Sequence, residues 1–307
     1  MLLMLFCVPI LLTAGGREII EKLGAKKAKW LSPVDKMLFS VSLKLVSGQT
    51  IFLKGRLELE KVIAVILAAG ESTRMNSPIS KLLHKIGDYF LIELPVKACI
   101  KAGVGRIIMV VGHQAEKIKE VVGGRCLYVY QEERLGTGDA LRKASFLFSS
   151  FNGEVLVLPG DAPFVTYSIL KDIVRYHREK NSVATILTAF LSDPASYGRV
   201  VRDSNNTVKK IVEKKNATPE ELRIKEVNSG VYCFDAQKIV EVLPLLKPDK
   251  VSGEVYLTDV FEIFYSKGQR VEALCVQDPL VAMGVNTPCD LERARKIFAQ
   301  KYKNLIN

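Results

Sequence analysis

The sequence predicts an α/β protein in which a mainly parallel sheet is flanked by helices. Short apolar runs of strand length recur from residue 62 onward, and several of the segments between them space apolar residues three or four positions apart. Alternation of buried strands with amphipathic helices is typical of parallel sheets covered on both faces. Ligands bind beyond the carboxyl ends of the strands in such sheets, so the loops after the strands are the places to search for a site.

Six apolar runs are the predicted strands. In chain order they are VIAVIL (62–67), RIIMVVG (106–112), EVLVLPGD (154–161), SVATILTAF (182–190), GVYCF (230–234) and VEALCV (271–276). Each run is short and almost continuously apolar, which is the pattern of a strand buried on both faces.

Helical periodicity occupies several of the intervening segments. It occurs in QAEKIKEVV (114–122), GDALRKASFLF (138–148) and SILKDIVRYHREK (168–180), and residues 288–304 predict a C-terminal helix. Residues 91–103 are also helical in pattern, but Pro95 requires that this helix either begins near Leu94 or is kinked. The sequence leaves those two alternatives open.

The first 61 residues differ from the rest and predict a separate N-terminal extension preceding a domain at 62–307. Residues 1–13 are almost all apolar, but this stretch is shorter than the roughly 17 to 25 residues that a membrane-spanning helix needs. No basic segment precedes it, so we expect a dispensable extension, the alternative being a membrane tether or an export signal. Residues 38–53 alternate well enough to predict a hairpin that turns at SGQ.

Composition narrows the functional class. The chain has 307 residues, of which 48% are hydrophobic and 25% charged, and these are ordinary values for a globular protein with a substantial core. Its net charge of +11 suits acidic, phosphorylated substrates, and no run of Lys and Arg with interleaved aromatics predicts nucleic-acid binding. The six cysteines contain no C-x-x-C pair, so we expect free thiols in a reducing, cytoplasmic compartment.

A basic loop follows the first predicted strand. Gly70 permits backbone angles that let successive N–H groups form an anion cradle, while Arg74 and Lys81 supply full positive charge. The spacing matches neither the P-loop pattern nor the G-x-G-x-x-G of dinucleotide-binding folds. Taken alone, the loop predicts either a phosphate site or a solvated surface turn.

The residues of this loop resemble a family signature. LAAGESTRMNSPISKLLHKIG (67–87) is similar to the signature of sugar-1-phosphate nucleotidyltransferases, most closely to the uridyltransferase (pyrophosphorylase) half of bacterial bifunctional N-acetylglucosamine-1-phosphate uridyltransferases. Further motifs follow in the family's order, namely VVGHQAEKIKEVV, QEERLGTGDAL, PGDAPF, YGRVVRD, IVEKKNAT, VNSGVYCF, GEVYLTD and GVNTPCDL. Two positions depart from the pattern: Ser72 replaces a second glycine and Ser80 replaces a proline. The resemblance implies a Rossmann-like fold of the nucleotide-diphospho-sugar transferase type.

Two predicted metal ligands are also argued from their neighbours. Asp161 ends an apolar strand in a Gly-Asp-x-Pro turn, where a carboxylate faces the ligand crevice or caps the turn. Asn286 precedes a helix start at which Thr287 and Asp290 form a capping-box-like pattern, so the residues alone indicate a turn. The resemblance implies that Asp161 and Asn286 bind Mg²⁺, an ion that needs only one or two protein oxygens beside phosphates.

The remaining roles are implied by the resemblance. Arg74 and Lys81 would be the catalytic cations that offset charge on pyrophosphate. The implied nucleotide-binding residues are Leu67, Ala68, Ala69, Gly70, Gln131, Gly136 and Thr137. The implied sugar-binding residues are Gly198, Glu213 and Asn228.

The implied reaction is Mg²⁺-dependent transfer of a uridylyl group from UTP to N-acetylglucosamine-1-phosphate, which releases pyrophosphate. Two alternatives stay open: another sugar-1-phosphate or nucleotide, such as glucose-1-phosphate, or a non-catalytic sugar-nucleotide-binding protein. No hexapeptide repeat of a left-handed β-helix occurs after residue 288, so we expect no acetyltransferase activity. The sequence does not predict an oligomeric state.

Overall fold

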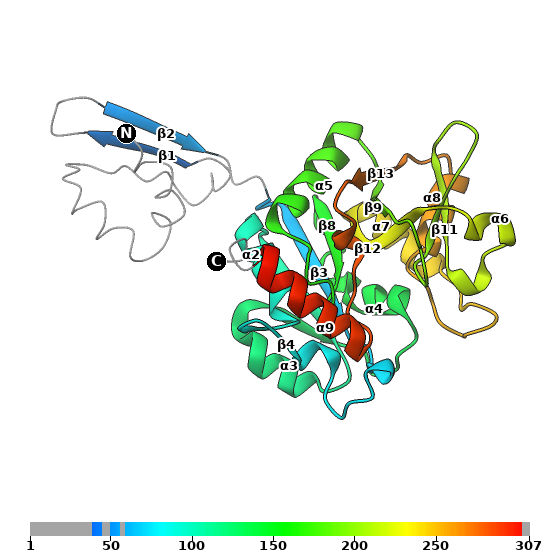
Figure 1. Cartoon of the computed structure of the whole chain (residues 1–307). Coiled ribbons are helices and arrows are strands. Elements are labelled where there is room, and N and C mark those ends of the chain that lie inside the picture. Colours follow the sequence, from blue (N-terminus) through cyan, green and yellow to red (C-terminus); the bar gives the residue numbers. More distant parts are fainter. Residues whose placement is uncertain (1–38, 45–49, 56–58, 303–307) are drawn as a thin grey trace. The chain divides into compact units, whose positions relative to one another are not determined.

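The computed structural model describes residues 39–44, 50–55 and 59–302 (Figure 1). The chain divides into two units, residues 1–58 and 59–307, which are described separately. In the first unit, β1 (Phe39–Lys44) pairs antiparallel with β2 (Thr50–Gly55), as the alternation of residues 38–53 predicts. The predicted SGQ turn and the apolar segment 1–13 lie outside the described residues.

Nine strands of the described second unit form one mixed sheet, in agreement with the predicted α/β class. They are β3 (Val62–Ala68), β6 (Arg106–Val111), β7 (Leu127–Tyr130), β8 (Glu154–Pro159), β9 (Ala184–Phe190), β10 (Arg199–Arg202), β11 (Val208–Val212), β12 (Glu226–Asp235) and β13 (Val271–Val276). The order β7-β6-β3-β8 is parallel throughout, and β13 lies parallel to β9. β12 runs antiparallel to both β8 and β9, and β10 and β11 continue that antiparallel side.

Helices cover both faces of this sheet (Figure 1). Their bounds are α2 (Glu93–Ala102), α3 (Ala115–Val122), α4 (Thr137–Ala144), α5 (Tyr167–Lys180), α6 (Pro219–Leu222), α7 (Ala236–Val242), α8 (Asp259–Ser266) and α9 (Pro288–Ile297). A two-stranded ribbon of β4 (Lys85–Ile86) and β5 (Tyr89–Phe90) lies between the basic loop and α2.

Two hydrophobic cores sit on the two sides of the sheet. Successive residues of β3 alternate between them, with Ala64 and Ile66 in one core and Ile63 and Val65 in the other. The first core also takes residues from α2, α3, α5 and α9, and the second takes residues from α4, α7 and α8. This double cover explains why the strand runs are continuously apolar rather than alternating.

Proline and capping residues set two helix starts. Helix α2 begins at Glu93, so Pro95 lies in the first turn, where its missing N–H has no intrahelical partner to lose. Thr287 and Asp290 form a capping box at the start of α9, as their spacing predicts. Helix α9 ends at Ile297 and is followed by a π-helical turn at Phe298–Tyr302; the last two residues of the predicted 288–304 helix lie outside the described residues.

Candidate active site

The predicted site residues gather at one edge of the sheet. The parallel strands β3, β7 and β8 end at the same edge, and they are followed by Ala69 and Gly70, Gln131, and Asp161 respectively. Because β12 runs antiparallel to β8, its early residue Asn228 also lies at this edge. The sheet topology therefore brings together residues that are distant in sequence.

The basic loop is closed by the two serines that depart from the family signature. Ser72 has a φ of 64° and lies in the left-handed region, which explains why glycine suits this position. Its Oγ accepts a hydrogen bond of 3.1 Å from the Lys81 backbone N–H, which ties the two ends of the loop together. The buried Ser80 caps the turn at Lys81–Leu83, and its own N–H donates to Gln114 Oε1 at 3.1 Å, a bond that proline could not make.

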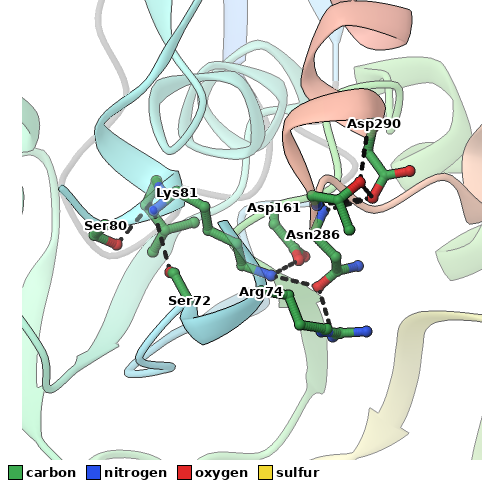
Figure 2. Close-up of polar contacts among 9 residues, drawn as sticks. Ser72, Arg74, Ser80, Lys81, Asp161, Asn286 and Asp290 are labelled. Carbon is green, nitrogen blue, oxygen red and sulfur yellow. Dashed lines mark hydrogen bonds and ion pairs between the residues drawn. The ribbon is translucent and has the colours of Figure 1, made fainter. Parts of the chain in front are cut away.

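Two cations and two oxygens meet at the centre of the edge (Figure 2). Lys81 Nζ forms an ion pair with Asp161 Oδ2 and donates to Asn286 Oδ1 at 2.8 Å. Arg74 Nη2 donates to the same Asn286 oxygen at 3.0 Å. The side chains of Lys81 and Asp161 are each 15% exposed, so this cluster is partly shielded from water but open to a ligand.

Backbone hydrogen bonds hold Asp161 and Asn286, the residues that carry the two oxygens, in place. Gly160 N–H donates to Leu67 O at 2.9 Å, and Val285 N–H donates to Asp161 O at 3.1 Å. On the helix side, Asp290 Oδ2 accepts from the backbone N–H of Asn286 at 3.1 Å, so the α9 capping box also fixes Asn286. Asn286 is therefore both the turn residue that the sequence indicates and a member of the site.

The pair Asp161 and Asn286 fits a divalent metal ion whose remaining ligands are phosphate oxygens and water. One cation, the Lys81 ammonium, contacts an oxygen of each residue, which shows that the two oxygens converge on a common point. Among the described residues, no group of three or more His, Cys, Asp or Glu side chains is placed to hold a metal ion, so a closed protein cage is not present there. An open pair of oxygens is the arrangement that Mg²⁺ uses with nucleotide phosphates.

The predicted nucleobase residues form a second cluster. Gln131 is buried, and its Nε2 donates to Gly136 O at 3.0 Å and to Asp139 Oδ2 at 2.9 Å. Gly136 has a φ of 104°, and a Cβ there would lie 2.5 Å from Val255 O, so only glycine fits. Thr137 Oγ1 accepts from Leu257 N–H at 3.0 Å. The GEVYLTD segment thus holds this turn against the sheet edge.

The three predicted sugar-binding residues are also in contact. Gly198 O accepts from Asn228 N–H at 2.9 Å, and a Cβ on Gly198 would lie 3.5 Å from Glu213 Oε1. The Asn228 side chain is oriented by its Nδ2 donating to Tyr232 Oη at 2.8 Å. Burial raises the pKa of the Glu213 carboxyl above its ordinary value, and the nearby carboxylate of Asp259 raises it further.

Contacts between loops link these clusters. Arg134 pairs with Glu71 at 3.1 Å, which joins the loop after β7 to the loop after β3. Thr258, within the GEVYLTD segment that holds Gly136, donates to Glu213 at 3.4 Å. Sequence reasoning assigned no role to Asp139, Gln114 or Val255, although each lies within a quoted motif. Their contacts hold the predicted residues in place.

Comparison with known proteins identifies the family. Residues 63–279 match the nucleotidyl transferase family, which is more than half of the chain, so the chain belongs to that family. Among curated proteins, bifunctional protein GlmU of Acetivibrio thermocellus is 43% identical over 243 residues, covering 79% of this chain and 53% of that protein. Those of Carboxydothermus hydrogenoformans and Enterococcus faecalis are 41% and 40% identical and cover 79% and 80% of this chain, in each case 54% of the relative.

The comparisons confirm the predicted family and the nucleotidyltransferase class. The chain spans about half the length of the curated relatives that it matches. Within the described residues, no helix is both long and apolar enough to cross a membrane. All five cysteines of the described residues are free thiols, as predicted, while Cys7 lies outside them.

Proposed function

We propose that this chain transfers a uridylyl group from UTP to N-acetylglucosamine-1-phosphate in the presence of Mg²⁺, giving UDP-N-acetylglucosamine and pyrophosphate. The observation that carries the proposal is the convergence of Lys81 and Arg74 with the oxygens of Asp161 and Asn286 at the carboxyl edge of the sheet. The relatives named GlmU support the choice of reaction. The free thiols suit a reducing compartment and hence the cytoplasm.

In this reaction a phosphate oxygen of the sugar phosphate attacks the α-phosphorus of UTP. The new bond joins that oxygen to the α-phosphorus, and the bond from the α-phosphorus to the pyrophosphate oxygen breaks. Such a transfer needs alignment and charge compensation rather than a covalent nucleophile. The cluster around Asp161 supplies these two requirements.

Each part of the site has a distinct task in this proposal. Arg74 and Lys81 bind the leaving pyrophosphate and offset its growing negative charge. Asp161 and Asn286 would hold Mg²⁺, which neutralises phosphate charge and orients the α-phosphate when bound. Leu67, Ala68, Ala69 and Gly70 line the loop next to the nucleotide.

The two flanking clusters select the substrates. The cluster of Gln131, Gly136 and Thr137 binds the uracil, and the cluster of Gly198, Glu213 and Asn228 binds the N-acetylglucosamine moiety. Glycines at positions 136 and 198 leave room for close approach, because each contacts a neighbouring segment where a side chain would clash or crowd.

A substrate panel tests the proposal. The full chain is incubated with Mg²⁺, each of UTP, CTP, ATP, GTP and dTTP, and each of N-acetylglucosamine-1-phosphate, glucosamine-1-phosphate and glucose-1-phosphate, and pyrophosphate release is measured. We expect the highest kcat/KM for UTP with N-acetylglucosamine-1-phosphate. A higher value for another pair would replace the proposed substrates, and no release from any pair by folded protein would leave a non-catalytic binding protein.

A further inference from the structure

Asp139 is a buried carboxylate to which neither the sequence motifs nor the proposed reaction assign a task. It lies in the first turn of α4 and is 1% exposed. It accepts hydrogen bonds from two side chains: Gln131 Nε2 at 2.9 Å and Arg142 Nη2 at 2.7 Å. A buried acidic group with one charged partner and one partner in a predicted binding cluster is a candidate for positioning that cluster.

The surroundings of Gln131 fix which end of its amide faces inward. Both of its neighbours on the Nε2 side, Gly136 O and the Asp139 carboxylate, accept hydrogen bonds and donate none. Turning the amide over would place Oε1 against two acceptors, which is repulsive. The nitrogen is therefore held inward, and both of its hydrogens are used.

The oxygen of the same amide is left for a ligand. Gln131 Oε1 accepts no hydrogen bond from another described residue. It is also not one of the fully buried, unpartnered polar atoms of the described residues, so a ligand can reach it. The group that this residue presents is thus an acceptor alone. A glutamine that was free to rotate would present a donor as readily as an acceptor.

We propose that Asp139 is a positioning residue that sets nucleobase preference by holding Gln131 with its carbonyl oxygen toward the base. The proposal rests on the proposed function, in which Gln131 contacts the base of the nucleotide. Uracil carries one ring N–H, at N3, and that group donates to Gln131 Oε1. The N3 atom of cytosine is an acceptor and meets the same oxygen with repulsion, so the fixed orientation favours UTP over CTP.

Asp139→Asn separates this role from simple packing because it preserves the shape of the side chain. Arg142 still requires an acceptor, so the oxygen of the new amide faces Arg142 and its NH₂ faces Gln131. That NH₂ repels the Gln131 amide hydrogens and favours the reversed orientation, in which Nε2 points to the base. Only Gly136 O then opposes the reversal, so both orientations become accessible. The change therefore lowers the affinity for UTP and raises the affinity for CTP, whereas a loss of packing would change both affinities alike.

The experiment compares the affinities for UTP and CTP, measured by titration calorimetry with Mg²⁺, in the wild-type chain and in Asp139→Asn. The same two nucleotides are compared by kcat/KM with N-acetylglucosamine-1-phosphate. Asp172→Asn is the matched control, because Asp172 also pairs with an arginine three residues later but lies on α5 in an exposed position. Thermal unfolding of each variant measures its folded fraction.

We expect the UTP to CTP affinity ratio to fall by about tenfold or more in Asp139→Asn, the size of one lost discriminating hydrogen bond, and to stay within about twofold in Asp172→Asn. An unchanged ratio in folded Asp139→Asn, or a wild-type protein that binds CTP as tightly as UTP, would overturn the positioning role. A chain that discriminates UTP from CTP in binding through Asp139 but shows no turnover would retain this inference and lose the proposed function.

Discussion

At the scale of single residues, Ser72 shows how a side chain can replace the glycine of a signature loop. The residue adopts φ 64° and ψ 31°, which costs a non-glycine residue on the order of 1 kcal/mol or more. The hydrogen bond from Lys81 N–H to Ser72 Oγ, at 3.1 Å, offsets part of that cost. The hydroxyl thus has a structural role in the loop, and its hydrogen can still be donated to a phosphate.

Substitutions of Ser72 separate these two effects. Ser72→Ala keeps the strained backbone and loses the hydrogen bond, so we expect the free energy of unfolding to fall by about 1 kcal/mol. Ser72→Gly also loses the bond but relieves the strain, so it should be more stable than the alanine variant by about 1 kcal/mol. Urea unfolding measures both values, and an alanine variant that is more stable than the glycine variant would refute this interpretation.

Asp161 is the residue on which the proposed metal role depends. Asp161→Asn keeps the size of the side chain but removes the negative charge that faces Lys81. We expect kcat to fall by about 100-fold or more, which corresponds to roughly 2.7 kcal/mol, and the Mg²⁺ concentration for half-maximal activity to rise. Steady-state kinetics over a Mg²⁺ series measures both, with Asp172→Asn as the control. Turnover in Asp161→Asn equal to wild type would contradict the mechanism.

At the scale of elements, helix α5 docks on the sheet through a buried histidine. His177 is 4% exposed, and its Nδ1 forms a hydrogen bond of 2.9 Å with Thr185 Oγ1 on β9. Burial lowers the pKa of His177 from 6.5 to about 4, although the carboxylates of Glu154 and Asp235 act in the opposite direction. His177 is therefore neutral in the folded protein at neutral pH.

The lowered pKa makes stability depend on pH. Between pH 6.5 and 4 the unfolded chain binds a proton at His177 and the folded chain does not, so the stability that is fully present above pH 6.5 decreases as the pH falls. At pH 5 this loss amounts to about 2 kcal/mol relative to pH 8. Urea unfolding at both pH values should show a smaller loss in His177→Gln, and an equal loss in that variant would assign the effect to other groups.

Element prediction from sequence succeeded where burial is two-sided and was incomplete elsewhere. The six apolar runs all contain strands. Most of these strands are buried on both faces and are therefore continuously apolar, whereas β13, which pairs only with β9 among the described strands, is mostly partly buried. Strands β7, β10 and β11 were not predicted, since they are short and β10 and β11 carry charged residues within four or five positions. The apolar pattern also did not predict strand direction, because an apolar run does not indicate that β12 lies antiparallel to β8.

The candidate site also contains residues that the sequence predicted and a residue that it did not. Gly70, Arg74, Lys81, Asp161 and Asn286 belong to motifs, and the structure brings the last four together. Asp139 lies within a predicted amphipathic helix, where an acidic residue ordinarily indicates a solvated face, so its burial against Gln131 could be recognised only in three dimensions.

At the scale of the whole molecule, we propose that one edge of a doubly covered sheet is a nucleotidyl-transfer site. The residues predicted to bind the base, the phosphates and the sugar lie on or beside strands β3, β7, β8, β10, β11 and β12 and on the turn before α9.

Phosphorus NMR of the complete reaction tests the proposed uridylyl transfer. The full chain is mixed with UTP, N-acetylglucosamine-1-phosphate and Mg²⁺, and the phosphorus resonances are followed with time. We predict that UDP-N-acetylglucosamine and pyrophosphate appear in equal amounts as UTP is consumed. Folded protein that yields neither product, or that converts UTP to UDP and inorganic phosphate, would contradict uridylyl transfer at this site.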